Sequence, residues 1–424
     1  MSPTRRGGGL ATAAKGARHR EKYSPPLRSR RRPRTLTDRE IRRRTLDWAL
    51  PLLVASLSQS FPLPSLRQTV DLLLRAAARG ISVTRARVQC RRGVSDRTAR
   101  HHLEHLERRK VQRALTLTLR RQIQPYLPHH PVDVAIDLHD RPYYGGPIDR
   151  RRPQYVKTKE ERGTHRAYRY ATLSVLLPNF RFIASVRYVD HSGGMLGVVQ
   201  AALYDFEQAG GEVRRVLLDR GFYTFQVLSW LKAKGLTAIV PLRLGSRQRK
   251  KWERGNKAYV TEHALRDPKG EAAPLPLTIH VVVRYQRGRK WGKHGCQYLI
   301  FAVLGNVPLA DTDTIYRRRF GIETSYRMIG QALARTSSRR PALRLLHMGV
   351  AALLHNEWAI LKLLWASEGR QGPKGFVVVE ERLRFEDLLN HLARAISYRL
   401  GEKREVIRRR RLPHRLRALQ EGSA

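Results

Sequence analysis

Acidic residues are scarce in this chain, and their scarcity is its strongest compositional signal. Asp and Glu number 35 among 424 residues, against 83 Lys and Arg, which gives a formal net charge of +48. An excess of this size predicts a polyanionic partner, because each basic group placed on a phosphate releases condensed counterions. Double-stranded DNA is the partner that we expect, and a membrane surface or an acidic protein could use the same charge.

Cysteines and long apolar runs are also scarce. The two cysteines, Cys90 and Cys296, lie far apart and cannot form a zinc site by themselves, and no histidine spacing supplies one. No run of about 18 apolar residues is present to span a bilayer, and the Arg-rich N-terminus lacks the apolar core of a secretory signal. These features predict a cytoplasmic, nucleoid-associated protein without membrane contact.

The residue pattern divides the chain into four parts. Residues 1–45 are rich in Arg, Gly, Pro and Ser without periodicity, so we expect a disordered basic arm there. Residues 46–127 show helical periodicity and are predicted to form a DNA-binding domain. Residues 128–365 mix strand and helix patterns, which predicts an α/β catalytic domain with a β-rich insertion at about 245–312. A helical basic tail is expected at 366–424.

Two short helices around a turn are expected at Ser82–Leu106. Gly93 marks the turn, and Ser95 is a candidate N-cap for the second helix. Three polar side chains would point outward from the N-terminal part of that helix, as base contacts require: Arg97, Arg100 and His101. The cadence resembles the helix-turn-helix domains of transcriptional regulators, and an ordinary helical hairpin with an Arg-rich face is the alternative.

From Val132 onward the expected order is strand, strand, strand, helix, strand, helix, strand, which is the order of the ribonuclease H fold. Asp137 lies in the first strand, and Asp219 directly follows the apolar strand Val213–Leu218. Ligands gather at the carboxyl ends of strands in open α/β sheets. A buried ionised Asp at such an end requires a charge partner, hydrogen bonds or a metal.

Glu323 is the third candidate acid, since two-metal phosphodiester cleavage requires several converging carboxylates. Tyr316, Arg319 and Glu323 fall at i, i+3 and i+7, and would share one face if residues 316–327 form one helix. Basic and aromatic groups beside a single Glu suggest an acid that serves a phosphate site. The alternative is a surface ion pair between Arg319 and Glu323.

Three strings carry a family resemblance: Ile136-Asp-Leu-His-Asp-Arg-Pro-Tyr-Tyr-Gly145, Leu218-Asp-Arg-Gly-Phe-Tyr223 and Arg319-Phe-Gly-Ile-Glu-Thr-Ser-Tyr326. With the pattern Tyr-x-x-Arg-x-x-x-Glu, they resemble the insertion-sequence-four superfamily of DDE transposases, and most of all its haloarchaeal-type branch. The resemblance covers roughly Val132–Leu364. It implies a ribonuclease-H-like domain that cleaves transposon ends and transfers the freed strand into target DNA.

The resemblance also implies roles for particular residues. Three acids would bind Mg²⁺, for which Mn²⁺ can substitute: Asp137, Asp219 and Glu323. Tyr316 and Arg319 would contact phosphates of the transposon end. The family places a Lys seven residues after the Glu, where this chain has Gly330, and Arg327 is a candidate to replace that charge.

Several alternatives stay open at this point. Asp140 competes with Asp137 as the first metal ligand, and Asp133 and Asp149 lie close by in the sequence. A homodimer is expected, since joining two transposon ends requires at least two protomers. The competing functions are an endonuclease of the same fold without strand transfer, and a transposase-derived regulator that binds DNA without cutting it.

Overall fold

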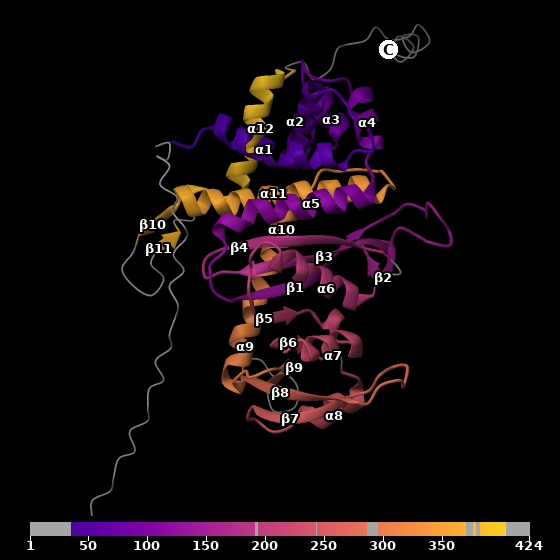
Figure 1. The fold of residues 1–424 in the computed structure, drawn as a ribbon, viewed down its shortest axis with the longest axis vertical. Coiled ribbons are helices and arrows are strands. Elements are labelled where there is room, and N and C mark those ends of the chain that lie inside the picture. The colour runs from indigo at the N-terminus through magenta and orange to yellow at the C-terminus, as the bar shows by residue number, and fades with distance from the viewer. Residues whose placement is uncertain are drawn as a thin grey trace, which may run out of the picture.

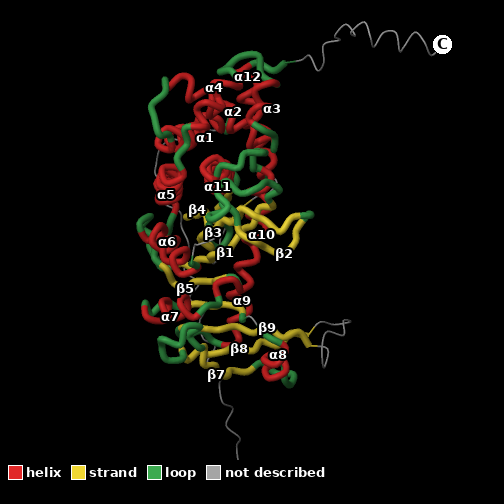
Figure 2. Tube along the Cα trace, turned by 90° about the vertical axis from the view of Figure 1, so that its right-hand side faces the viewer, coloured by secondary structure: helices red, strands yellow, loops and turns green. Residues whose placement is uncertain are grey.

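A layer of helices lies against one end of a large mixed sheet (Figures 1 and 2). The computed structural model describes residues 35–190, 194–242, 244–285, 296–369, 376–378 and 382–403. Residues 1–34 of the predicted basic arm and residues 404–424 of the predicted basic tail therefore lie outside the described residues. None of the described helices is long and apolar enough to cross a membrane.

The main sheet has nine strands: β1 (Val132–Pro142), β2 (Val156–Glu161), β3 (Thr164–Leu176), β4 (Arg181–Val189), β5 (Val213–Leu218), β6 (Ala238–Pro241), β7 (Tyr259–Leu265), β8 (Leu275–Tyr285) and β9 (Cys296–Leu304). Their order is β2-β3-β1-β5-β6-β9-β8-β7, and β4 also pairs with β3. β1 is antiparallel to β3 and parallel to β5, and β5 is parallel to β6. The part β4-β3-β1-β5-β6 is consistent with the expected ribonuclease-H-like domain.

Alternation along β1 determines which face of the sheet each side chain occupies. Val134 and Ile136 pack in the core beneath α6 (Met195–Glu207) and α7 (Phe225–Ala233). Ala135 packs in the opposite core, with Ile315 and Ile322, which belong to the helical segment that follows β9. Side chains two residues apart share a face, so Asp137 belongs to this second face.

The expected β-rich insertion extends the sheet instead of forming a separate module. β9 pairs antiparallel with β6, from Ala238 opposite Leu304 to Pro241 opposite Phe301. β8 and β7 continue outward from β9, and the short helix α8 (Ser246–Trp252) precedes them in the chain. The inserted strands therefore share backbone hydrogen bonds with the strands of the predicted catalytic core.

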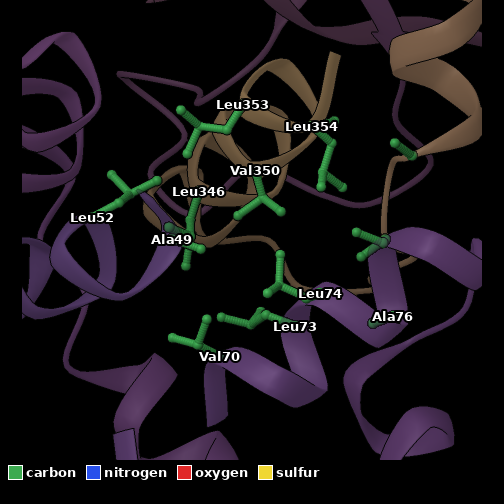
Figure 3. Close-up of a cluster of buried hydrophobic side chains, with 14 of the residues drawn as sticks. Ala49, Leu52, Val70, Leu73, Leu74, Ala76, Leu346, Val350, Leu353 and Leu354 are labelled. Carbon is green, nitrogen blue, oxygen red and sulfur yellow. The ribbon is translucent and has the colours of Figure 1, made fainter. Parts of the chain in front are cut away.

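The helical layer combines elements from both ends of the described chain: α1 (Asp38–Ser56), α2 (Leu63–Arg79), α3 (Val83–Val88), α4 (Asp96–Glu104), α5 (Arg108–Ile123), α11 (Pro341–Trp365) and α12 (Phe385–Leu400). Figure 3 shows the apolar side chains of α1, α2 and α11 that meet in its core, among them Leu52, Leu74 and Val350. α11 also packs on β4, where the Asn356 amide bonds both backbone groups of Ile183. Short elements complete the chain: η1 (Gln124–Tyr126), and β10 (Ser367–Gly369) paired with β11 (Phe376–Val378).

Helix α12 packs on α1 and α2, although more than 300 residues separate them in the chain. The buried Asp71 of α2 accepts two hydrogen bonds from Arg42 of α1, at 2.8 and 2.6 Å, and pairs with Arg399 of α12 at 3.5 Å. The buried Arg75 of α2 bonds Ser397 and pairs with Glu402. The last described helix is thus part of the same layer as the first two.

The predicted disordered arm at 1–45 extends too far, because α1 begins at Asp38. The Thr37 hydroxyl caps this helix by accepting a hydrogen bond from the Glu40 amide at 3.2 Å. Acidic Asp38 and Glu40 lie in its first turn, where they interact favourably with the helix dipole. The run of arginines concealed this start, since Arg42 is held by a buried acid rather than exposed to solvent.

Candidate active site

Asp137 and Asp219 lie beside each other where the parallel pairing of β1 with β5 ends. Ile136 of β1 is in register with Leu218 of β5, so the two aspartates follow paired residues. Asp219 begins the 3-10 turn η2 (Arg220–Phe222), and its carboxylate accepts from the Gly221 amide at 3.5 Å. The sheet topology therefore brings together two acids that lie 82 residues apart in the chain.

Glu323 approaches the same place from the helix α10 (Gly321–Gln331), where it lies in the first turn. The pKa of Asp137 is raised to about 6, first by burial and then by the negative charges of Asp219 and Glu323, although Arg319 acts against the rise. Two like charges have this effect on a carboxyl group only when they are close to it. Asp219 and Glu323 therefore lie within electrostatic range of Asp137.

Arg319 lies between the acids. Its Nη1 donates to Asp137 Oδ2 at 2.9 Å, and its Nη2 lies 3.9 Å from Asp219 Oδ1. The side chain is buried, and its guanidinium lies over the Tyr316 ring, 5.3 Å from the centroid. The alternative of a surface Arg319–Glu323 ion pair is therefore wrong, because Arg319 is buried and pairs with Asp137.

Tyr316 is also buried, and its hydroxyl donates to the Leu218 carbonyl at 3.2 Å. Burial raises the pKa of Tyr316, so the phenol stays neutral. Its contact with the main chain at the end of β5 connects the helical segment to the strand that carries Asp219. Tyr316 therefore helps to position the acids, and its predicted phosphate contact stays a prediction.

The expected single helix over 316–327 is wrong. Tyr316 lies on α9 (Leu309–Arg317), Arg319 on the 3-10 turn η4 (Arg318–Phe320), and Glu323 on α10. At the break, the Arg181 guanidinium packs so close to Gly321 that a Cβ atom would collide with it. The tighter turn carries Arg319, which faces the aspartates.

Three further side chains support the site, and sequence reasoning missed them. Tyr326 of α10 hydrogen bonds to Thr172 of β3 at 2.6 Å, and Thr172 is the register partner of Asp137. His139 stacks on the Tyr326 ring, with centroids 4.5 Å apart. Burial lowers the pKa of His139 to about 4, so this imidazole is neutral. The signal was the alternation Asp137, His139, which puts both on the face that α10 covers.

The competing aspartates have other partners. Asp133 is fully buried among arginines and bonds three of them: Arg214, Arg215 and Arg318. Asp140 accepts two hydrogen bonds from Arg169, both at 2.7 Å. Asp149 lies in a loop, where it accepts from the Arg151 amide. These contacts favour Asp137 over Asp140 as the first acid of the site.

The residues fit a divalent cation in donor type, since carboxylate oxygens are the ligands that Mg²⁺ prefers. The mutual repulsion that raises the Asp137 pKa is also what a cation would relieve. Within the described ranges, however, no three His, Cys, Asp or Glu side chains lie close enough together to hold a metal. Arg319 provides the positive charge between Asp137 and Asp219 in this conformation.

The predicted DNA-reading side chains lie elsewhere. Ser95 caps α4, as expected, Ser82 caps α3, and the turn between the two helices contains Gly93. All three predicted side chains on α4 are exposed: Arg97, Arg100 and His101. Arg100 pairs with Asp96 of its own helix. Figure 1 places α4 on the other side of α5 and α11 from the sheet.

Arg327 lies on the exposed side of α10, and no described acid pairs with it. The position of the family Lys, Gly330, faces Arg141 of β1: an added Cβ would lie 3.7 Å from an Arg141 Nη1. Arg141 was not among the predicted site residues. It follows Asp137 by four residues and so shares its face of β1.

The large mixed sheet, with Asp137 and Asp219 adjacent on its parallel strands, is consistent with the α/β class of ribonuclease-H-like domains. The model of the transposase DDE domain family matches residues 134–356, which is more than half of the chain. The protein belongs to this family, which implies transposase activity. No curated protein matches the chain.

Proposed function

We propose that the protein is a DNA transposase of the insertion-sequence-four superfamily, from its haloarchaeal-type branch. It cleaves DNA at the ends of its element and joins the freed 3′ ends to target DNA. The proposal rests on the adjacent positions of Asp137 and Asp219, which follow paired residues of β1 and β5, with Glu323 within electrostatic range of Asp137. The net charge of +48 supports DNA as the substrate.

In this proposal the three acids hold divalent ions, Mg²⁺ or Mn²⁺, which activate the attacking oxygen and stabilise the leaving one. Arg319 holds Asp137 in place and exchanges this contact for a phosphate when DNA binds. Its guanidinium suits either partner, since it makes charge-assisted hydrogen bonds to carboxylates and phosphates. The Tyr316 ring supports the Arg319 guanidinium, which lies over it.

The helical layer serves DNA binding in the same proposal. Helices α3 and α4 act as a helix-turn-helix, with Arg97, Arg100 and His101 directed at base edges. Synapsis of two ends uses a homodimer. We divide the chain into a DNA-binding part at about 38–127, which includes the whole of α1, and a catalytic part at about 128–365, and the tail 366–424 adds α12 to the first.

The test uses a labelled duplex that spans the boundary between the element and its flanking DNA. We expect Mg²⁺-dependent cleavage and strand transfer by the native chain, and loss of both in EDTA. Three isosteric variants should lose both steps while still binding the duplex: Asp137→Asn, Asp219→Asn and Glu323→Gln. Asp140→Asn and Asp149→Asn are the matched controls and should stay active.

Other outcomes separate the alternatives. Normal activity in any of the three acid variants removes that residue from the site. Cleavage without strand transfer favours the endonuclease, and DNA binding without either step favours the regulator. Activity lost in Asp140→Asn but kept in Asp137→Asn would move the first ligand three residues along β1.

A further inference from the structure

A basic cavity of about 280 Å³ opens beside the C-terminal half of β1. Four arginines line it: Arg141, Arg162, Arg335 and Arg344. Tyr144 and Tyr170 also line it, and its described lining includes no Asp or Glu. A cavity with four cations and no lining acid has the composition of an anion site.

The cavity lies on the same face of β1 as Asp137. Arg141 follows Asp137 by four residues, about 13 Å along the strand. α10 runs beside this row, since Tyr326 stacks on His139 and Gly330 faces Arg141. The cavity therefore continues the surface that the candidate acids begin.

The Arg141 guanidinium has no ion pair or hydrogen bond among the described residues. Burial, and to a smaller degree the charge of Arg162, lower its pKa, yet an arginine stays charged in proteins. A half-buried cation without a counter-ion is costly and favours the binding of an anion.

Arg344 is held in place by backbone and aromatic groups. It donates to the Ser338 carbonyl at 2.7 Å and lies 4.6 Å from the centroid of the Tyr168 ring. Neither contact neutralises its charge. Arg344 therefore adds a fixed positive charge to the cavity wall, opposite the unpaired Arg141.

We propose that this cavity binds a backbone phosphate of the DNA strand that enters the acid site, with Arg141 as its principal cation. The inference rests on the proposed function, since it takes the substrate to be DNA. A separation of about 13 Å corresponds to about four nucleotides of B-DNA at 3.4 Å per nucleotide. Arg141 thereby supplies from the sheet a charge that α10 lacks at Gly330.

The experiment measures binding of the boundary duplex in EDTA, where no cleavage occurs. Arg141→Met should weaken binding about tenfold and lower the slope of log K against log salt by about 0.9. A single methylphosphonate about four nucleotides from the cleaved bond should weaken binding by the native chain about as much. The same replacement should have no further effect on Arg141→Met, because the contact is already lost.

Two variants of Gly330 make the test independent of the loss of Arg141, since a Cβ fits there. Gly330→Glu should neutralise Arg141 and weaken binding by a similar factor in a protein that keeps every native side chain. Gly330→Lys, added to Arg141→Met, should restore binding. Arg266→Met, which changes an exposed arginine directly after the edge strand β7, is the control and should bind like the native chain.

Unchanged binding and salt slope in both Arg141→Met and Gly330→Glu would overturn the proposal. So would a methylphosphonate series in which no position depends on Arg141. These outcomes differ from failure of the proposed function, which is judged by cleavage in the acid variants. If the Asp137→Asn variant still cleaves DNA while the Arg141-dependent phosphate contact is found, the cavity proposal stands. The assignment of the site acids is then wrong.

Discussion

Two buried aspartates on one face of β1 have opposite surroundings. Asp133, near the start of the strand, bonds three arginines, which hold its pKa below the usual range against the effect of burial. Asp137, four residues later, has Arg319 as its ion-pair partner and two acids nearby, and its pKa is raised to about 6. The same residue type on the same strand face is therefore stabilised near the start of β1 and destabilised at its middle.

The difference lies in the balance of charge. Around Asp133 the cations outnumber the acid, so the carboxylate joins β1, β5 and η4 as a structural anchor. Around Asp137 the acids outnumber Arg319, so the cluster gains by binding further positive charge. Local charge balance thus distinguishes a structural carboxylate from a candidate ligand, where strand alternation treats both alike.

The largest effect that we expect is on the stability of the fold, and it comes from Asp133. Asp133→Asn should lower the free energy of unfolding by about 2–4 kcal/mol, because it leaves arginines beside a buried neutral group. Urea unfolding measures the change. Asp140→Asn is the control, and it should cost less than about 1 kcal/mol, since the Asp140–Arg169 pair is partly exposed. Equal, small losses in both variants would remove the anchor role.

At Asp137, removal of the charge should stabilise the metal-free protein. The folded pKa of Asp137, about 6, lies above its unfolded value of 3.8, so its ionisation destabilises the fold as the pH rises from about 4 to 6. Asp137→Asn should therefore match the native chain near pH 4 and exceed it by up to about 3 kcal/mol above pH 6. Unfolding in EDTA at several pH values measures this, and a gain that does not grow with pH would contradict it.

Arg319 should affect catalysis more than folding. Arg319→Ala should lower the cleavage rate about a hundredfold, equivalent to about 2.7 kcal/mol, through loss of a phosphate contact and of the Asp137 partner. Arg319→Lys should restore part of the rate, because a lysine keeps the charge without the planar fork. Single-turnover cleavage measures both variants. A normal rate in Arg319→Ala would restrict Arg319 to charge compensation.

The smallest effect concerns α4, which is distant from both aspartates. Arg97→Ala, Arg100→Ala and His101→Ala should each weaken binding to element ends more than to random duplex, by about 1–3 kcal/mol for a lost base contact. Cleavage at saturating protein should stay normal, which separates DNA reading from chemistry. Equal losses on both duplexes in a gel-shift titration would make these side chains phosphate contacts.

The sequence predicted most of the central strands, because their apolar patterns are local. β5 was predicted from its apolar run, and the prediction matches the structure at both ends. β2 (Val156–Glu161) was missed, since its charged, exposed sequence has no apolar alternation. A strand of this kind is stabilised by its pairing with β3, which local patterns do not reveal.

The contacts between α10 and β1 could not be predicted, because they depend on how the helix packs along the strand. The stacking of His139 on Tyr326 and the approach of Arg141 to Gly330 join residues about 190 positions apart. Arg327 was the natural candidate for the missing charge, because it lies one turn from Glu323 in the same helix. The structure offers a second candidate from another element, which sequence spacing cannot indicate.

The docking of α12 on α1 and α2 has a consequence for the order in which the nascent chain folds. The ribosome synthesises α1 and α2 early, but Asp71 and Arg75 receive Arg399 and Glu402 only after some 300 further residues have been added. Domains usually fold as units, beginning with the N-terminal one during translation. Here the N-terminal helices stay incomplete until the catalytic part has been made, so translation delivers both parts together.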